Sequence, residues 1–314
     1  MWDDHSGFEP LPNADLGQLE RWRAAGVDYL SINVGYDVMG WQETFKALAA
    51  FRAWVVAHGE AYTLAGTVAE VDAAKAVGKL AVAFDIEGMN ALDGMTDLVG
   101  LYYDLGVRQM LFAYNRNNLA GGGCHDSDVG LTDFGRAVVA EMNRVGMVLD
   151  CSHTAYRSTM EAMEISSAPV IFSHSNPRAL KDHQRNIRDD QILACARTGG
   201  VIGVNGIGIF LGENDIRTAT LGDHVEYLAN LTGPAHVGIS LDYAAGEAEI
   251  GSLLGSKPDI WPAGQGYDTP NMQFAAPEQL PQLAEALLDR DWTEDDLRGV
   301  LGGNFRRVAA QVWK

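Results

Sequence analysis

The feature that most constrains the fold is a regular alternation between short apolar runs and longer amphipathic segments. Seven runs of five or six residues are rich in Val, Ile, Leu or Phe, at residues 29–34, 80–84, 109–114, 147–151, 169–173, 201–205 and 237–241. Continuous apolar runs bounded by polar turns are typical of parallel strands that are buried on both faces. The sequence therefore predicts a parallel sheet.

The segments between these runs carry apolar residues at helical spacing. We expect helices over 41–58, 132–145, 154–165 and 221–231. Gly59 follows the first of them, and Gly233 stops the last, as glycines at helix C-termini do. Strand followed by helix, repeated along the chain, indicates an α/β protein.

The number of units distinguishes a barrel from an open sheet. Together with a short N-terminal segment around His5, the runs give about eight strands, which favours a (β/α)8 TIM barrel. No GxGxxG or P-loop sequence follows any run, so nothing supports a nucleotide-binding open sheet. We therefore expect one barrel domain over residues 1–314, with a C-terminal helical extension from about residue 275. Residues 244–277 are irregular and rich in Gly, Pro and Ala, which is typical of a functional or mobile loop.

Charge and cysteine content exclude several classes of partner. The chain has 23 basic and 42 acidic residues, a net charge of −19, which argues against nucleic acid and against an anionic membrane surface. Its three cysteines are an odd number without a CxxC pair, as in proteins of a reducing cytoplasm. The first residues resemble no secretory leader, and no apolar run could span a bilayer. We expect a cytoplasmic protein without leader or anchor.

Polar residues at the ends of the apolar runs carry the candidate chemistry. They are His5, Glu87, Tyr114, His153, His174 and Asp242. In a barrel the C-terminal ends of the strands meet at one mouth, where active sites lie. Three imidazoles and two carboxylates at one mouth suit Zn²⁺ and related ions, and a hydrolytic site uses such an ion to acidify a water molecule. Alternatively, each histidine is an ordinary core residue.

The remaining histidines fit this simpler interpretation to different degrees. His58 ends a predicted helix, where a cation complements the helix dipole. His224 lies within a helical pattern and His236 just before a strand, so we expect both to be structural or exposed. His125 and His183 lie in loops after strand ends and could border the mouth.

At these residues the sequence resembles the membrane dipeptidase (renal dipeptidase) family of the amidohydrolase superfamily. The resemblance covers nearly the whole chain. Its motifs are 130–136 (GLTDFGR), 141–147 (EMNRVGM), 150–153 (DCSH), 168–175 (APVIFSHS), 185–186 (RN) and 302–308 (GGNFRRV). An ordered set of this kind is far more specific than any single motif.

The resemblance implies a (β/α)8 barrel that holds two zinc ions bridged by a glutamate. Glu87 then corresponds to the bridging ligand, and His153 and His174 to the imidazoles on the second metal. Arg185 resembles the arginine that receives the substrate's carboxylate, for which its guanidinium fork is well suited. Asp242 resembles the aspartate that orients the attacking water and transfers its proton. Relatives are often homodimers, so the resemblance also implies a possible homodimer.

The first strand departs from the family pattern. The family has His-x-Asp there, and alternate residues of a strand share a face. Here His5 is followed two residues later by Gly7, which has no side chain to offer. The first metal therefore loses a charged ligand and binds weakly, through an added water or Glu9, or not at all. Asp3 shares the face of His5 but lies one step deeper, so it is not counted as a replacement.

Tyr114 is the second departure, because the family has a substrate-contacting histidine at this position. A phenol can still donate a hydrogen bond to a developing oxyanion, although it carries no positive charge. Alternatively, Tyr114 only packs at a strand end. Cys124, in a Gly-rich loop, offers a thiolate as a further candidate ligand.

These observations leave three functional hypotheses. The first is a zinc-dependent, dipeptidase-like hydrolase that cleaves a small amide or dipeptide carrying a carboxylate. The second keeps the metal chemistry on a non-peptide amide or a lactone with an acidic group. The third is a binding protein without catalysis, against which the retention of Glu87, Asp242 and both second-metal histidines weighs.

Overall fold

Parallel strands form a closed ring in the computed structural model, which describes residues 1–245, 254 and 256–314. The strands of the ring are β1 (Trp2–Phe8), β2 (Tyr29–Tyr36), β4 (Leu80–Glu87), β5 (Val107–Leu111), β6 (Val148–Asp150), β7 (Val170–Ile171), β8 (Ile202–Val204) and β9 (Val237–Ile239). Two further strands are short: β3 (Tyr62–Leu64) pairs with the start of β4, and β10 (Ala244–Ala245) pairs with the end of β1.

Sheet pairing shows how the ring closes. The hydrogen-bonded order is β10-β1-β2-β4-β5-β6-β7, and β8 pairs with β9. A parallel bridge between Phe172 and Ile202 connects the β7 side to β8. On the other side, the Asp242 amide donates to the His5 carbonyl at 3.2 Å, so the chain after β9 reaches β1. This arrangement confirms the predicted (β/α)8 fold.

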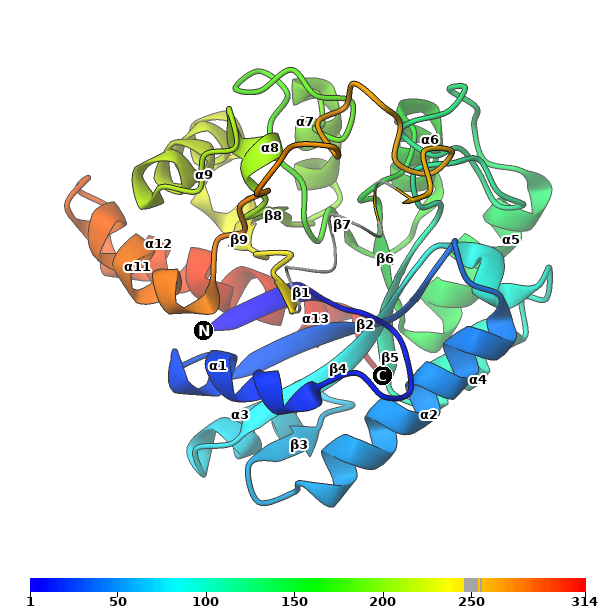
Figure 1. The fold of residues 1–314 in the computed structure, drawn as a ribbon, viewed down its shortest axis with the longest axis horizontal. Helices are drawn as coiled ribbons and strands as arrows, with labels where there is room; N and C mark the ends of the chain where they lie inside the picture. Colours follow the sequence, from blue (N-terminus) through cyan, green and yellow to red (C-terminus); the bar gives the residue numbers. More distant parts are fainter. Residues whose placement is uncertain (246–253, 255) are drawn as a thin grey trace.

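Helices surround the ring on its outside (Figure 1). They are α1 (Leu19–Ala24), α2 (Trp41–Ala57), α3 (Val68–Ala76), α4 (Leu98–Asp104), α5 (Asp133–Val145), α6 (Tyr156–Ile165), α7 (Asp189–Arg197), α8 (Gly208–Leu211), α9 (Thr218–Thr232), α11 (Leu280–Leu288), α12 (Glu294–Arg298) and α13 (Asn304–Val312). The last three form the expected C-terminal extension, and Phe305 and Val308 of α13 pack in one apolar cluster with Trp2 of β1. Within the described residues, no helix has the length and apolar character needed to cross a membrane.

Several predicted boundaries were wrong by a few residues, for identifiable reasons. β4 continues to Glu87 because its pairing with β2 extends that far. β7 is only two residues long, because the Ser173 amide donates to the Asp150 carboxylate. α6 begins at Tyr156 rather than residue 154, since the Ala155 amide donates to the Gly122 carbonyl.

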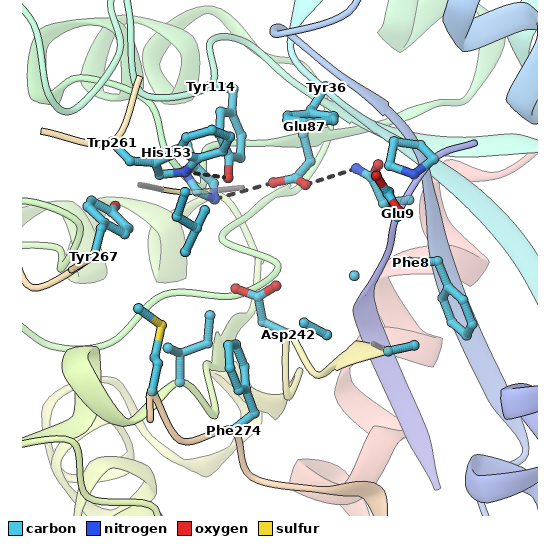
Figure 2. A pocket seen from close by; sticks show the side chains of 18 of the residues that line it. Phe8, Glu9, Tyr36, Glu87, Tyr114, His153, Asp242, Trp261, Tyr267 and Phe274 are labelled. Atoms are coloured by element: carbon cyan, nitrogen blue, oxygen red, sulfur yellow. Dashed lines mark hydrogen bonds and ion pairs between the residues drawn. The ribbon is translucent and has the colours of Figure 1, made fainter. Parts of the chain in front are cut away.

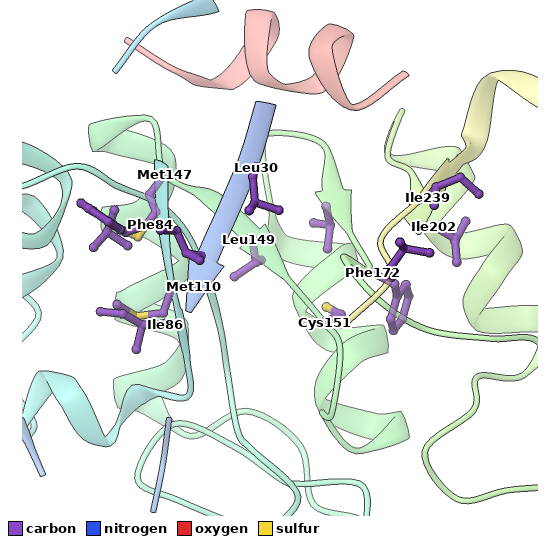
Figure 3. Close-up of a cluster of buried hydrophobic side chains, with 14 of the residues drawn as sticks. Leu30, Phe84, Ile86, Met110, Met147, Leu149, Cys151, Phe172, Ile202 and Ile239 are labelled. Atoms are coloured by element: carbon purple, nitrogen blue, oxygen red, sulfur yellow. The ribbon is translucent and has the colours of Figure 1, made fainter. Parts of the chain in front are cut away.

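Toward the C-terminal ends of the strands, apolar side chains face outward and polar ones face inward. In β4, Phe84 and Ile86 belong to the main apolar cluster under the helices (Figure 3). Asp85 and Glu87 alternate with them and instead contact polar groups of neighbouring strands. This period of two residues aims every second side chain of a strand into the barrel.

Residues 257–276, here called the roof segment, contain only turns, bends and an isolated bridge between Phe274 and Ile207. This agrees with the irregular stretch predicted over 244–277, of which residues 246–253 and 255 lie outside the described residues. The roof segment is attached over the C-terminal ends of the strands. The Asn115 amide group donates to the Ile260 carbonyl at 3.3 Å, and Arg116 donates to the Asp259 carbonyl.

Candidate metal centre and active site

Four candidate ligands meet at the C-terminal mouth of the barrel, with Glu87 at their centre. One carboxylate oxygen of Glu87, Oε1, lies 3.7 Å from His5 Nε2. The other, Oε2, lies 3.3 Å from His153 Nε2 and 3.6 Å from His174 Nε2. The structure therefore brings together residues from β1, from the end of β4 and from the turns after β6 and β7, as their strand-end positions suggest.

Two atoms of this group are buried without a hydrogen-bond partner among the described residues, namely His5 Nε2 and Glu87 Oε2. One potential ligand atom from each of His5, Glu87 and His174 falls within a span of 4.8 Å. His153 Nε2 lies 3.1 Å from His174 Nε2, directly beside this group. Imidazole nitrogens and a carboxylate are ligands that zinc prefers. Because unpaired buried polar atoms are costly, these residues fit a metal ion.

Neutral hydrogen-bonding groups contact the Nδ1 atoms of two histidines and so fix the orientation of their rings. His153 Nδ1 lies 2.7 Å from the side-chain oxygen of Asn115. His174 Nδ1 lies 2.7 Å from the Ser173 hydroxyl, which donates to the Asp150 carboxylate. With the proton on Nδ1, each ring presents Nε2 as the free electron pair, as metal-binding histidines do.

His5 is held differently, by a charged group. Its Nδ1 lies 3.2 Å from an Asp85 carboxylate oxygen, and Asp85 also accepts a hydrogen bond from Ser31 at 2.6 Å. Asn33 donates to Glu87 at 2.9 Å and so fixes the central carboxylate. Sequence reasoning missed these supporting residues. The signal was the alternation of Asp85 with Glu87 along one strand.

Burial and neighbouring charges set the protonation of the group. Burial and nearby cationic side chains lower the pKa of His153 and His174 well below the usual value, so both rings are neutral at neutral pH. Burial opposes protonation of His5, but Asp85 and Glu87 outweigh it and raise the pKa of His5 well above normal. Burial raises the pKa of Glu87 to about 8. A metal ion bound here would displace the proton that these groups retain.

Asp242 completes the polar group from the far side of the mouth (Figure 2). Its Oδ1 lies 3.5 Å from His5 Nε2, and its Oδ2 accepts a hydrogen bond from Asn205 at 2.7 Å. Asp242 has φ of 52° and His153 has φ of 60°, both in the left-handed region. Strained non-glycine backbone of this kind clusters at functional sites.

Position 7 faces the same group, as the alternation along β1 predicts. A Cβ built on Gly7 would lie 3.9 Å from Asp242 Oδ1 and 3.7 Å from the Ala244 backbone. The site therefore has room for a side chain that the sequence does not supply. Asp3 does not replace it, because its carboxylate accepts hydrogen bonds from Trp22 and the Leu241 amide. Glu9 lines the mouth but is not part of the described ligand group.

Comparison with known proteins shows which family the chain is related to. Residues 29–254 match the family model described as membrane dipeptidase (peptidase family M19). The chain belongs to the membrane dipeptidase family. Over 245 residues it is 30% identical to the dipeptidase aclJ of Aspergillus oryzae, covering 75% of this chain and 52% of that protein. The chain thus spans about half the length of the curated relatives it matches.

Two solved structures resemble the barrel over nearly its full length. An amidohydrolase from Pseudomonas aeruginosa has a TM-score of 0.90 and 28% identity, covering 99% of this chain and 96% of that one. A metallo peptidase from Rhodobacter sphaeroides, liganded with a phosphinate mimic of L-Ala-D-Ala, has a TM-score of 0.81 and 21% identity, covering 99% of both chains. The second similarity concerns the fold alone.

Tyr114 packs directly on a candidate ligand. Its ring stacks on His153 with centroids 4.1 Å apart. The indole nitrogen of Trp261, in the roof segment, donates to the Tyr114 hydroxyl at 3.2 Å. Because the hydroxyl accepts this bond, its own proton remains available for another acceptor. Trp261 was missed by sequence reasoning because it lies in an irregular segment far along the chain.

Arg185 lies close to the metal group but lines a different cavity from Glu87. It is 2% exposed, and it donates to Ser175 Oγ at 3.1 Å and to the His174 carbonyl at 2.8 Å. Its Nε has no partner among the described residues. Cys124 lines the same cavity, and burial raises the pKa of its thiol to about 12. Cys124 is not among the grouped ligands that the structure describes.

His125 and His183 border the mouth by holding the roof segment. His125 Nε2 lies 2.8 Å from the Tyr267 hydroxyl, and His183 Nε2 donates to the Gln265 carbonyl at 2.7 Å. The other three histidines bond to backbone carbonyls. These are His58 to Trp54, His224 to Leu211 and His236 to Gly200. They have the structural environment expected from the sequence.

Proposed function

We propose that this protein is a zinc-dependent hydrolase that cleaves a small amide, most simply a dipeptide. The observation that supports it best is the Glu87 carboxylate, which lies within 3.7 Å of three imidazole Nε2 atoms while its own Oε2 has no hydrogen-bond partner among the described residues. Membership of the membrane dipeptidase family and the dipeptide mimic bound by the Rhodobacter protein support the same substrate class.

His5, Glu87, His153 and His174 would hold the metal. When bound, zinc supplies an acidified water molecule and polarises the scissile carbonyl. Asp242 accepts the proton of the attacking water and returns it to the departing amine. The hydrogen bond from Asn205 to Oδ2 fixes the carboxylate and leaves Oδ1 directed at His5, toward the centre of the group.

Tyr114 and Arg185 orient the substrate. The Tyr114 hydroxyl, which accepts a hydrogen bond from Trp261, donates a hydrogen bond to the carbonyl oxygen as negative charge develops there. The buried guanidinium of Arg185 receives the carboxylate of the substrate through its unpartnered Nε–H. Both groups are already held by protein contacts, so little ordering is required when the substrate binds.

We further propose that the two metal positions are unequal. The side formed by His153, His174 and Glu87 has its imidazoles fixed by neutral partners. The His5 side lacks the carboxylate that position 7 would supply. One zinc ion should therefore bind tightly, and a second should bind weakly.

Elemental analysis combined with a dipeptide panel tests the function. The purified protein is expected to carry one tightly bound zinc per chain and to hydrolyse dipeptides from a panel of L,L and L,D isomers. No bound metal even after zinc addition would contradict the proposal.

Tyr114 stands where the family resemblance implies a histidine. This difference favours a second candidate function, hydrolysis of a non-peptide amide or lactone with an acidic group. Bound zinc with turnover of those compounds and of no dipeptide would support that alternative.

A further inference from the structure

Two cavities of opposite character meet at His153. The cavity at the mouth is walled largely by aromatic rings, among them Phe8, Tyr36, Phe210, Trp261, Tyr267 and Phe274. Figure 2 shows Glu87 and Asp242 facing each other across it. The second cavity contains three arginines, Arg178, Arg185 and Arg188, and two aspartates, Asp126 and Asp128, so its lining has a small net positive charge. His153 lines both, so the reacting centre lies between a largely aromatic cavity and this basic cavity.

The charged groups of the two cavities differ as well. The ionisable acids and bases that line the mouth cavity are Glu9, Glu87, Asp242 and His153, and no lysine or arginine is among the described residues there. Glu87 and Asp242 belong to the metal group. Glu9 is exposed at the rim. Away from the metal group, the described lining of this cavity is therefore mainly apolar, and none of its described residues offers a lysine or arginine to a negatively charged ligand.

This difference between the two cavities determines which end of a substrate lies in each. If the carboxylate lies against Arg185 in the basic cavity, the amine half of the scissile amide lies on that side of His153. The acyl half then extends into the aromatic cavity. Two hydrophobic residues from separate segments, Ile207 after β8 and Met272 of the roof segment, add to its lining. A small or charged acyl group would leave this surface uncovered.

We propose that the acyl half of the substrate carries a large apolar group, while the amine half is a small amino acid with a free carboxylate. The proposal rests on the proposed function, and it narrows the substrate class to apolar-acyl amino acids. These include dipeptides with a bulky apolar N-terminal residue and amino acids with an N-linked fatty acyl chain. Burying a leucine- or phenylalanine-sized group favours such substrates over glycyl ones by roughly ten- to a hundred-fold in kcat/KM.

A matched panel of substrates tests this orientation. On the zinc-loaded protein, kcat/KM should rise through Gly-Ala, Ala-Ala, Leu-Ala and Phe-Ala, and from N-acetyl-alanine to N-octanoyl-alanine. The reversed series Ala-Leu and Ala-Phe should show no comparable rise. Equal rates along the first series, or a steeper rise along the reversed one, would overturn the proposal. The dipeptide and N-acyl arms distinguish which apolar acyl group the cavity accepts.

Met272 provides the variant, because it lines the cavity and is only partly buried in the apolar cluster. Met272→Glu places a carboxylate of similar length in the apolar wall. It should lower kcat/KM for Phe-Ala at least about tenfold more than kcat/KM for Gly-Ala. Met272→Leu conserves volume and polarity, so it should retain the preference of the parent protein. Parallel losses on both substrates in Met272→Glu would contradict a role in selecting the acyl group.

A binding measurement, which does not depend on activity, separates this inference from the proposed function. Calorimetric titration should show N-octanoyl-alanine binding at least about tenfold tighter than N-acetyl-alanine, with a negative heat-capacity change. If no compound in the panel is hydrolysed but this ratio is found, the hydrolase assignment fails and the apolar cavity stands. Equal binding of the two acyl-alanines would overturn the inference whatever the activity.

Discussion

The two sides of the candidate metal centre are built differently. On the β6–β7 side, His153 and His174 are each fixed through Nδ1 by a neutral, buried partner, Asn115 and Ser173. On the β1 side, His5 Nδ1 contacts the Asp85 carboxylate, and the next residue on the same face of the strand is Gly7. A ligand fixed in one tautomer loses little freedom when it binds a metal. The β6–β7 side is therefore preorganised, and the β1 side is incomplete.

Removal of a ligand from the complete side should have the largest effect. In His153→Ala, tight metal binding and hydrolysis should both be abolished, since only Glu87 and His174 remain on the complete side and His5 belongs to the incomplete one. Metal content by elemental analysis and turnover of the best substrate measure the two losses. His236→Ala, which removes a histidine bound to the Gly200 carbonyl, serves as control. Full metal content in His153→Ala would refute the assignment of His153.

Sequence analysis could predict that these candidate ligands meet, because strand order brings strand ends together. Glu87 ends β4, and His153, His174 and Asp242 follow β6, β7 and β9, whereas His5 lies within the short strand β1; a parallel barrel places such positions at one mouth. The supporting contacts could not be predicted in this way. Asn115 reaches His153 from another loop, and Ser173 contacts the ring of the next residue, His174; both contacts depend on backbone conformation, and Asn115, for example, has φ of 62°.

The same distinction applies to the fold and to the walls of the mouth. The alternation of apolar runs and helices specified the barrel, whereas the strand lengths depend on side-chain contacts such as that of Asp150 with the Ser173 amide. Trp261 and Tyr267 reach the site from the roof segment, which has no periodic pattern. Their positions are determined by long-range contacts, for instance between Tyr267 and His125.

The support behind His153 predicts the next largest effect. Asn115→Ala should weaken zinc binding roughly 10- to 100-fold, the usual result of removing an outer hydrogen-bond partner of a metal ligand. Asn115→Asp keeps an acceptor oxygen and also tolerates the left-handed backbone, so it should retain most of the affinity. Competition with a chelator gives both affinities. Equal losses in the two variants would indicate the lost amide donor to the Ile260 carbonyl, and not the lost acceptor, as the cause.

Filling position 7 should make the two sides more alike. In Gly7→Asp, the added side chain lies next to Asp242 without a steric clash, and we expect metal content to rise from about one toward two ions per chain. Gly7→Asn adds an amide of nearly the same shape and should raise it much less. Elemental analysis after zinc dialysis measures the stoichiometry. An unchanged value in Gly7→Asp, with the fold intact by circular dichroism, would show that position 7 does not limit the β1 side.

The smallest predicted effect is on the free energy of unfolding. It concerns His125, in the loop after β5, which contacts Tyr267 of the roof segment. Burial lowers the pKa of His125 from 6.5 to about 4, so between these pH values the unfolded chain binds more protons than the folded protein. The free energy of unfolding must therefore fall as the pH drops through this window, by roughly 1 kcal/mol between pH 7.5 and 5.5 from this residue. Urea unfolding at both pH values should show a loss that is smaller by about this amount in His125→Gln than in the parent protein. Because the roof segment is anchored through this contact, a local loss of stability there should also weaken the binding of apolar-acyl amino acids at pH 5.5.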